Sequence, residues 1–434
     1  MWPLTVVLHS HITLVAIFPK IPSYTNNNEG VDKFKRFAWV KKLGFALIKT
    51  IYIDIGGQKI DEQYGDWMNI WHELSGSKSR AFNQLIGNTK ELTSFTDGKE
   101  ISTLYIPIKF WFCGSSGMAL PLINLLYSEV KITVELNNSN NLYLTTPSHS
   151  IKIYNDIVNF KQYEYIEQDI KNTKTFGIYI GHDINEKKIY YVKISGENFK
   201  GISHDTAQEI ENSISELENI NSNDYKIIGV ESKFEVYPDS NQIPNTISNY
   251  IDNISLRDCY LLVDYFYIDI NERKKFALST HEYIIDYVKF NGVKEVTSSN
   301  SVINLVINNP CSEILWTTQL KYLNDSRFIN NGSSYKDHFN YTDDYKYDSN
   351  NIFLGKNNVL SSKLLLNGND RIEERNGDYF NLIQSYQHHR NGASGGINSY
   401  SFSLFPEDNQ PSGLCNMSMI DQVSLELNLN KNIS

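Results

Sequence analysis

A strand, a glycine turn and a helix follow one another between Trp39 and Gly76, and this unit constrains the fold more than any other stretch. From Phe45 to Ile55 the odd positions are apolar except for Lys49, which predicts a half-buried strand. Gly56 and Gly57 then supply the positive φ values of a tight reversal. The chain is therefore expected to return at once as the second strand of a hairpin.

A short helix is expected after this hairpin, because Asp66 is placed to cap its free N–H groups and Gly76 lies just past its end. Four apolar side chains fall at i, i+3, i+4 and i+7, the spacing of one helical face. They are Trp67, Ile70, Trp71 and Leu74. This spacing predicts that both indoles face one core.

The same order of elements returns more than 300 residues later, between Leu364 and Gln384. Without gaps, residues 60–70 align with residues 372–382 and share five identities in eleven positions. The identical pairs are Ile60/Ile372, Glu62/Glu374, Gly65/Gly377, Asp66/Asp378 and Asn69/Asn381. A strand that ends in a turn, Asn367-Gly368, again precedes the aligned residues. Because the order of elements matches as well as the residues, the sequence indicates one β unit present twice.

The composition favours a β protein and disfavours a nucleic-acid partner. Aromatic residues make up 13% of the 434 residues, with 28 Tyr and 21 Phe, and such residues are frequent in sheets. The net charge is −10 and no run of Lys or Arg occurs. We therefore expect no direct nucleic-acid binding, which needs a concentrated basic surface. The length allows two or three domains, each with its own core.

Neither the cysteines nor the N-terminal residues indicate export. The four cysteines show no C-x-x-C spacing and are interpreted as buried thiols from a reducing compartment. They are Cys113, Cys259, Cys311 and Cys415. The segment Trp2–Phe18 is apolar but lacks a basic leader and is shorter than the roughly 20 residues that span a bilayer. We predict a pair of strands with a turn at His9–His11, and no transmembrane segment.

Strand-like segments recur along both halves of the chain, separated by loops rich in Asn, Gly and Pro. They are Leu104–Phe112, Glu129–Leu136, Cys259–Ile268, Tyr283–Phe290, Val302–Ile307, Ile314–Leu320, Leu360–Leu366, Ser399–Phe405 and Val423–Leu429. Pro107 removes one ladder donor, so its strand is expected at an edge or a bulge. The segment Cys259–Ile268 is apolar on both faces, which predicts a central strand.

From about residue 137 to residue 256 the sequence changes to Asn, Lys, Ser and Ile with weak patterning. A hairpin is expected from Phe176–Ile180 and Ile189–Ile194, and a capping box at Thr206 and Glu209 predicts a helix. We interpret this stretch as an inserted subdomain, since a structureless connection of this length is uncommon in a compact domain.

The expected fold is all-β: two tandem sandwiches with short helices in the loops. A charged, helix-like linker at Asn271–Glu282 places the boundary between them near residue 275. The first domain is thus residues 1–275, with the subdomain of residues 137–256 inserted in it, and the second domain is residues 276–434.

The motifs of metal enzymes are incomplete. Both His72-Glu73 and His281-Glu282 begin an H-E-x-x-H pattern, but Gly76 and Ile285 stand where the second histidine belongs. The most ligand-like pair is His388-His389, yet adjacent residues of a strand point to opposite faces. Hydrogen bonding within a loop is the favoured role for that pair, and we expect no metal site.

Other catalytic signatures are also missing from the sequence. The run Gly114-Ser115-Ser116-Gly117 fails the spacing of a nucleophile elbow, and neither a Walker nor a dinucleotide glycine pattern occurs. We therefore predict no catalytic residue, no cofactor-binding residue and no cofactor, which means that the chain is not an enzyme.

Five groups of segments resemble the major capsid protein of nucleocytoplasmic large DNA viruses, and they lie in the order of that family. They are residues 39–76, LYIPIKFWFC with ALPLINLLYSEVKITVEL, CYLLVDYFYIDINERKKFALSTHEYIIDYV, LLLNGNDRIEERNGDYFNLIQSYQHH, and INSYSFSLFPEDNQPSGLCNMSMIDQVSLEL. The resemblance leaves out the N-terminal segment, residues 137–256 and the loop of residues 321–358. Members of the family are double jelly rolls, three copies of which form a pseudo-hexagonal capsomer of an icosahedral shell.

The resemblance implies two tandem jelly-roll sandwiches and a structural subunit without catalysis. It implies as partners the chain itself in a homotrimer, neighbouring capsomers and minor capsid proteins. It further implies location in the virion after assembly in the host cytoplasm, with long loops such as residues 137–256 pointing outward.

Two departures and two rival functions accompany the resemblance. Family members usually have one further strand before the segment matching Ile12–Pro22 and one after the segment matching Val423–Leu429. A truncated or split gene product, or a diverged paralogue whose gaps neighbours fill, accounts for both. The rivals are a minor or penton-type capsid paralogue and a carbohydrate-binding sandwich. Stacking platforms of the latter would be Tyr163, Tyr165, Tyr179, Tyr190 and Tyr191.

Overall fold

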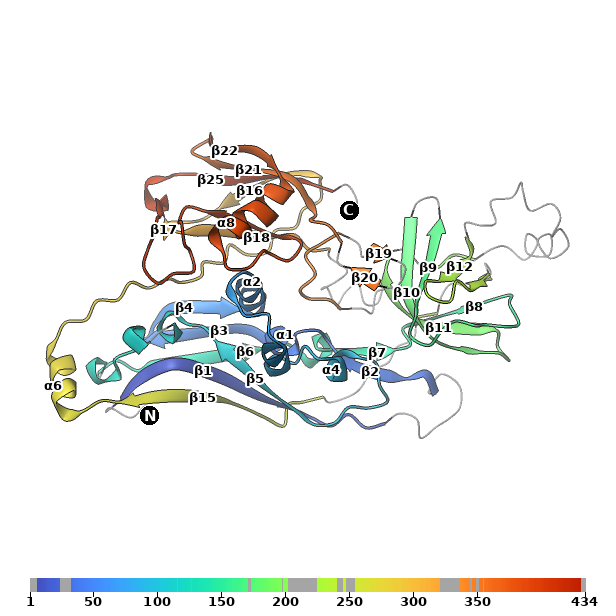
Figure 1. Cartoon of the computed structure of the whole chain (residues 1–434), viewed down its shortest axis with the longest axis horizontal. Coiled ribbons are helices and arrows are strands. Elements are labelled where there is room, and N and C mark those ends of the chain that lie inside the picture. The colour runs from blue at the N-terminus through green and yellow to red at the C-terminus, as the bar shows by residue number, and fades with distance from the viewer. Residues whose placement is uncertain are drawn as a thin grey trace.

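Short strands form most of the structure, which is a computed structural model (Figure 1). It describes residues 6–23, 33–114, 116–125, 127–170, 173–196, 198–201, 225–239, 245–246, 254–320, 336–343, 346–348, 351–353 and 355–430. Figure 1 shows a lower and an upper body of sheets, with a further sheet at one end and helix α6 at the other. In the part of the chain that is described, no helix is both long and apolar enough to cross a membrane.

The lower body, which we call the first half, consists of two three-stranded sheets that face each other across a core. Their orders are β15-β1-β5 and β4-β3-β6. The strands are β1 (Val6–Phe18), β3 (Ile48–Ile55), β4 (Gln58–Tyr64), β5 (Ser102–Ile108), β6 (Val130–Leu136) and β15 (Asp258–Tyr267). Alternate residues of β1 point inward, and Leu14 and Phe18 are almost fully buried. This period of two is the pattern that a half-buried strand requires.

The upper body, which we call the second half, repeats this plan. A four-stranded sheet has the order β16-β25-β21-β22, and β18 pairs with β23 beside it. The strands are β16 (Asn300–Leu305), β18 (Glu313–Thr317), β21 (Val359–Leu366), β22 (Asn369–Asn376), β23 (Ile397–Ser401) and β25 (Val423–Leu429). Two small pairs complete it: β17 (Pro310–Cys311) with β24 (Cys415–Asn416), and β19 (Lys346–Asp348) with β20 (Asn351–Phe353). Phe380 and Leu364 lie at the centre of its core.

A seven-stranded sheet forms the body at the end of the first half, in the order β13-β12-β9-β10-β11-β8-β14 (Figure 1). Its strands are β8 (His149–Lys152), β9 (Tyr165–Ile170), β10 (Thr173–Asp183), β11 (Lys188–Ser195), β12 (Ile227–Gly229), β13 (Glu235–Val236) and β14 (Asn245–Thr246). It has an apolar cluster of its own around Tyr191 and Phe199. The pair of β2 (Arg36–Trp39) and β7 (Tyr143–Thr146) connects it to the first half.

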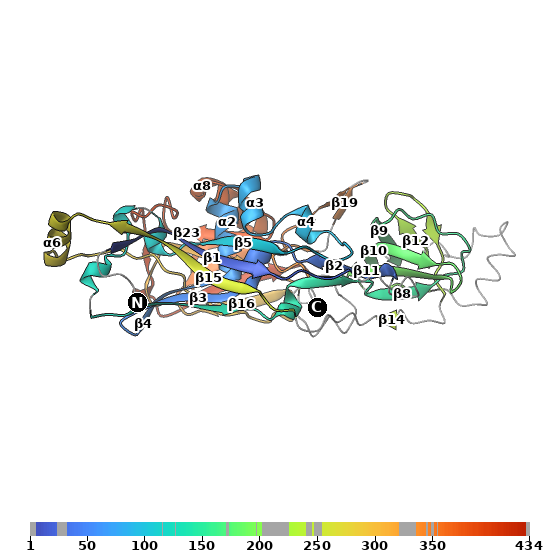
Figure 2. The same cartoon turned by 90° about the horizontal axis from the view of Figure 1, so that it is seen from below.

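Short helices lie at the ends and edges of the sheets. They are α1 (Leu43–Leu47), α2 (Gly65–Ser75), α3 (Arg80–Leu85), α4 (Lys90–Thr93), α6 (Ile270–Leu278), the π-helical turn η8 (Tyr379–Ile383) and α8 (Gln384–His388). Short 3₁₀ turns are η2 (Trp111–Cys113), η3 (Ser116–Met118), η4 (Leu122–Asn124), η5 (Ser139–Asn141) and η9 (Met417–Met419). Figure 2 shows α2, α3 and α8 on the same side of the molecule.

The predicted internal repeat is present. The first copy is β3, a turn, β4 and α2, and the second is β21, a turn, β22 and η8–α8. Both turns use two residues with positive φ: 59° and 81° at Gly56 and Gly57, and 51° and 74° at Asn367 and Gly368. Two successive positive φ values give the twist that a two-residue hairpin needs, which explains the Gly-Gly and Asn-Gly pairs.

The shared glycine of the repeat also has a steric reason. A Cβ atom on Gly65 would overlap the carbonyl oxygen of Phe45, and one on Gly377 would overlap that of Val359. The Gly65 Cβ would also overlap the carbonyl oxygen of Ile48, the first residue of β3, and Val359 is the first residue of β21, so in each half the start of the helix passes directly against the start of the first strand of the hairpin. The aligned Asn69 and Asn381 are both buried.

Several expectations from the sequence are wrong in detail. The segment Cys259–Ile268 is not central, because β15 pairs only with β1 among the described strands and its outer face is exposed. The described part of the predicted strand pair Trp2–Phe18 is a single strand, β1, with an irregular register between Leu8 and Ile12. Tyr283–Phe290 is not a strand but an extended part of the connection between the halves.

Further expectations concern single residues. Pro107 lies in β5, an edge strand of its described sheet, as predicted. The start of the predicted strand at Phe45 belongs to the short helix α1 instead. The N-cap of α2 is Tyr64, not Asp66, and has no side-chain cap. The capping box at Thr206 and Glu209 lies outside the described residues.

The cysteines are free thiols, and Cys259 is exposed where burial was expected. Cys311 and Cys415 are opposite each other in the β17–β24 pair, although they are far apart in the sequence.

The steric role of the repeat glycine predicts the effect of one methyl group. Gly377→Ala places a Cβ on the Val359 carbonyl, and the backbone must shift to admit it. We expect the free energy of unfolding to fall by about 1–3 kcal/mol, measured by urea denaturation. Gly392→Ala is the matched control because nothing lies within 4 Å of its added Cβ. Equal unfolding midpoints for the two variants would contradict this account.

Candidate functional site

The two halves of the chain meet at one junction, where α2 of the first half lies on β18 and β23 of the second. Leu74 of α2 is fully buried there, and Ile70 packs beside it. The second half contributes Leu315, Ile397 and Tyr341 to the same cluster. Figure 1 shows α2 between the two bodies.

Hydrogen bonds fix both ends of α2 to the second half. The backbone N–H of Asn391 donates to the carbonyl oxygen of Leu74 at 2.9 Å, and its side-chain amide donates to that of Gly76 at 2.6 Å. These bonds satisfy carbonyl groups that a helix end leaves without partners. At the other end, the Tyr341 hydroxyl donates to the Asp66 carboxylate at 3.2 Å. Asp66 therefore belongs to the junction.

A loop of the second half, residues 336–343, adds polar contacts to the first half. Asp337 pairs with Lys41 at 2.9 Å. The Lys336 ammonium donates to the Tyr143 carbonyl at 3.2 Å, and His338 Nε2 lies 2.7 Å from the Asn141 carbonyl. Because this loop also carries Tyr341, it connects α2 to the strand β7 that leads into the seven-stranded sheet.

A buried ionic cluster surrounds His389 at the same junction. Its Nε2 lies 2.6 Å from Glu313 and its Nδ1 lies 3.1 Å from Glu407. Arg390 pairs with the second oxygen of Glu407 at 3.2 Å. The indole of Trp71 from α2 contacts the imidazole edge to face, with ring centroids 6.1 Å apart. First-half and second-half residues thus share one buried cation.

The charge of this histidine follows from its neighbours. Burial alone would lower the pKa of His389, but the hydrogen bonds and charges of Glu313 and Glu407 outweigh it and raise the pKa to about 9. The imidazole is therefore a cation at neutral pH, which two carboxylates require if they are to be buried together. A neutral histidine would remove the cation that Glu313 faces and leave Glu407 with Arg390 alone.

The sequence predicted hydrogen bonding within a loop for His388 and His389, but His388 is the last residue of α8 and His389 is its C-cap. His389 lies within hydrogen-bonding distance of Glu313 and Glu407, and His388 Nδ1 lies 3.1 Å from the Leu404 carbonyl oxygen. The described residues contain no group of three or more His, Cys, Asp or Glu side chains that could hold a metal ion. Glu313 and Glu407 were not singled out, since nothing in their spacing marks them as partners of this histidine.

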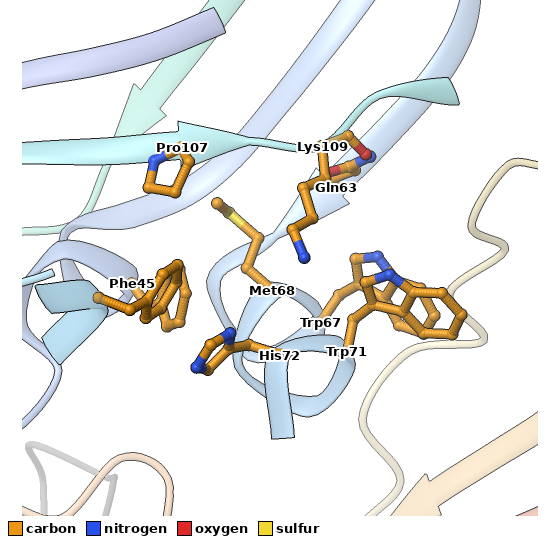
Figure 3. A pocket seen from close by; sticks show the side chains of 9 residues that line it. Phe45, Gln63, Trp67, Met68, Trp71, His72, Pro107 and Lys109 are labelled. Atoms are coloured by element: carbon orange, nitrogen blue, oxygen red, sulfur yellow. The ribbon is translucent and has the colours of Figure 1, made fainter. Parts of the chain in front are cut away.

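A small pocket lies beside the junction, between α2 and β5 (Figure 3). Its lining residues are Phe45, Gln63, Trp67, Met68, Trp71, His72, Phe82, Pro107 and Lys109. Figure 3 shows the two indoles at one side and Phe45 at the other, with Met68 between them. A volume of about 10 Å³ holds roughly one water molecule, whereas sites for small molecules need roughly 300 Å³ or more.

The pocket also settles the role of His72. Its ring stacks on Phe82 with centroids 3.8 Å apart, and burial followed by the charge of Lys109 lowers its pKa to about 4. His72 is thus a neutral packing residue of α2. The indoles of Trp67 and Trp71 stack on each other, 5.3 Å apart, and are only half-buried. The prediction that both face the core is wrong, because Met68 and His72 take the inward positions.

The connection between the halves is fixed to the first half. The backbone N–H of Val288 donates to Asp61 at 3.4 Å, and the ring of Phe290 contacts that of Tyr64 at 4.9 Å. Burial raises the pKa of Asp61 to about 6, although hydrogen bonds from Gln63 and Val288 lower it. His281 lies at the start of this connection, where it stacks on the Phe276 ring.

Many exposed apolar side chains lie on β15, on α6, on this connection and on or just after β16. They include Tyr260, Leu262, Phe266, Tyr267, Ile270, Leu278, Ile284, Tyr287, Phe290, Val293, Val302 and Val306. Patches of this kind mark surfaces that contact another macromolecule. The insertion differs, because Tyr179, Tyr190 and Tyr191 are buried in its core. They are not available as stacking platforms for a sugar.

Comparisons with known proteins agree with this arrangement. Residues 272–434 match the family model of the large eukaryotic DNA virus major capsid protein, and residues 8–181 match that of the major capsid protein N-terminus. The chain is 38% identical to probable capsid protein 4 of Acanthamoeba polyphaga mimivirus, over 98% of this chain and 81% of that protein. It is 27% identical to the major capsid protein of Phaeocystis pouchetii virus, over 90% and 75% of the two chains.

Solved structures show the same fold at low sequence identity. The Faustovirus major capsid protein matches with a TM-score of 0.62 at 9% identity, over 98% of this chain and 82% of that one. A chain of the PBCV-1 virus capsid matches with a TM-score of 0.54 at 19% identity, over 98% and 80%. The fold and its apolar surfaces define a double jelly-roll capsid subunit. The chain belongs to the family of major capsid proteins of large eukaryotic DNA viruses, and its role is structural.

The charge on His389 predicts a pH-dependent stability. The pKa is about 9 in the folded protein and about 6.5 in an unfolded chain. Stability from this charge is therefore fully present below about pH 6.5 and lost as the pH rises through 9. We expect His389→Gln to lower the free energy of unfolding by about 3 kcal/mol at pH 6.5 and by much less at pH 10.

Urea denaturation at several pH values measures this effect. His388→Gln is the neighbouring control, with an expected loss below about 1 kcal/mol at every pH. A difference between wild type and His389→Gln that stays constant from pH 6.5 to pH 10 would show that the buried histidine is neutral.

Proposed function

We propose that this capsid subunit assembles as a homotrimer, a pseudo-hexagonal capsomer that contacts neighbouring capsomers and minor capsid proteins in an icosahedral shell. The observation that carries the proposal is the duplicated unit: two halves of one plan give one chain two similar corners of a hexagon. The junction at α2 supports it, because a rigid junction keeps the two corners at a fixed angle. Residues 1–275, with the insertion of residues 137–256, and residues 276–434 are the two proposed jelly-roll domains.

We further propose that the chain has no catalytic activity and does not contact nucleic acid directly. In support, the pocket beside α2 holds about one water molecule, and the net charge is −10. Assembly takes place in the host cytoplasm under this proposal, and the finished protein resides in the virion. The insertion, which lies at one end of the two halves, points away from the shell.

A second candidate is a minor or penton-type capsid paralogue. The favouring observation is that the Mimivirus relative at 38% identity is named capsid protein 4, whereas the Mimivirus relative named capsid protein 1 is 24% identical. The abundance of the chain in purified virions distinguishes the two. A bulk shell subunit is among the most abundant virion proteins, and a penton or minor subunit is present in few copies.

The mass of the purified protein tests the trimer. Light scattering behind a sizing column should give three times 50.0 kDa, which is the mass of one chain. The interface of an obligate assembly is largely apolar, so the trimer should persist when the salt concentration is raised. A folded monomer at all salt concentrations would contradict the capsomer.

A further inference from the structure

Because the strand–turn–helix unit occurs twice, the helix face that packs at the internal junction has a counterpart in the second copy. In the first copy, α2 covers the second half with Ile70, Trp71 and Leu74. The offset of 312 residues that aligns residues 60–70 with residues 372–382, continued along the helix, places Leu382, Ile383 and Tyr386 at the equivalent positions. These three side chains lie on η8–α8 and form an equivalent apolar face.

The two faces differ in what covers them. Leu74 is 0% exposed, whereas its equivalent Tyr386 is 84% exposed. Leu382 and Ile383 are also exposed, while Ile70 and Trp71 are half-buried. The inward-facing positions of the two copies are buried alike: Asn69 and its equivalent Asn381 are buried, and so are His72 and its equivalent Gln384. The repeat therefore keeps the same helix orientation twice but supplies a partner within the chain only once.

The surface that receives α2 also has an equivalent. The receiving surface itself is the outer face of β18 and β23. Leu315 and Ile397 lie on this outer side, and Ile314 and Tyr400 lie on the inner side. β18 precedes the second copy of the repeat, β23 follows it, and the two strands pair. β1 and β5 hold the same positions around the first copy, and they pair in the same antiparallel way. The equivalent receiving face is therefore the outer face of β1 and β5.

This outer face carries exposed aromatic and aliphatic side chains, which flank Val15, itself fully buried. The register places Tyr105 of β5 and Tyr260 of β15 on either side of Val15, and both tyrosines are 43% exposed. Leu262 lies next to Thr13 in the adjoining row and is exposed as well. The molecule thus has one uncovered helix face on its second half and one uncovered sheet face on its first half. Together they match the two sides of its internal junction.

We propose that η8–α8 of one copy docks on the outer face of β15-β1-β5 of a second copy, in the way that α2 docks on β18–β23 within the chain. The inference rests on the proposed capsomer and names the surfaces that build it. The contact is heterologous, since different faces of the two copies meet. Such contacts either close into a ring or extend without limit. Three chains close the ring, because internal junctions and contacts between copies then alternate around six similar halves.

Single substitutions on each face test the contact. Tyr386→Glu and Tyr105→Glu each place a charge on one of the two faces and leave the other face intact. Each variant should be a folded monomer, with a dissociation constant raised at least about tenfold relative to wild type. Ile184→Glu is the matched control: its side chain is 67% exposed on the insertion, and the variant should remain a trimer. Near-ultraviolet circular dichroism and the urea midpoint verify that all three variants fold.

Mixing the two variants gives a result that only a heterologous contact produces. The Tyr105→Glu chain still has an intact helix face and the Tyr386→Glu chain an intact sheet face, so a mixture can form one contact and then stops. Light scattering should show a species of twice the chain mass in the mixture and none in either variant alone.

Two outcomes overturn the docking surfaces while the trimer stands: a Tyr386→Glu protein that is still trimeric, or a mixture that stays monomeric. A folded wild-type monomer overturns the proposed capsomer itself, so the two failures are distinguishable.

Discussion

The packing of α2 against the outer face of β18 and β23 is the interaction on which the relation of the two halves depends. Full burial of Leu74 and Ile397 contributes about 1.5–3 kcal/mol for each side chain. Apolar contact alone leaves an orientation loosely defined, and here the direction comes from polar groups. Asn391 binds the last carbonyls of α2, and Tyr341 binds Asp66 near its start. A helix held at both ends and along one face has little freedom to rotate.

The cation at His389 adds a different kind of constraint to the same junction. Glu313 of β18 and Glu407 both belong to the second half, and Trp71 of the first half contacts the imidazole. Burying charges is costly unless each is paired, so a displaced α2 would leave the group partly hydrated and weaken it. The cluster thus stabilises one arrangement of the two halves and is weaker in displaced arrangements.

Much of the strand pattern was predictable from the sequence, and so was the repeat. Gly-Gly and Asn-Gly turns and alternating apolar residues are local signals, and they identified β3, β6, β21 and β25 well. The position of β15 was predicted wrongly, because a strand that is apolar on both faces is typical of a sheet centre. Periodicity cannot distinguish burial by the same chain from burial by another one.

The junction itself was hardly visible in the sequence. Asp66 looked like a helix cap because its position fits one, and its true partner Tyr341 is 275 residues away. The pair of His389 and Glu313 spans 76 residues without any motif. Contacts of this kind depend on how the two halves meet, and only the three-dimensional arrangement brings their members together.

The seven-stranded sheet of the insertion buries Tyr191, Phe199 and Ile227 in an apolar cluster of its own. A body with an apolar cluster of its own depends less on the scaffold that carries it. Its outer loops can therefore change in length and chemistry while the spacing of the two jelly rolls, and with it the geometry of a lattice, stays the same. Under the proposed outward orientation of the insertion, this separates two selective pressures: the surface presented to a host can vary quickly, and the closure of the particle can remain fixed.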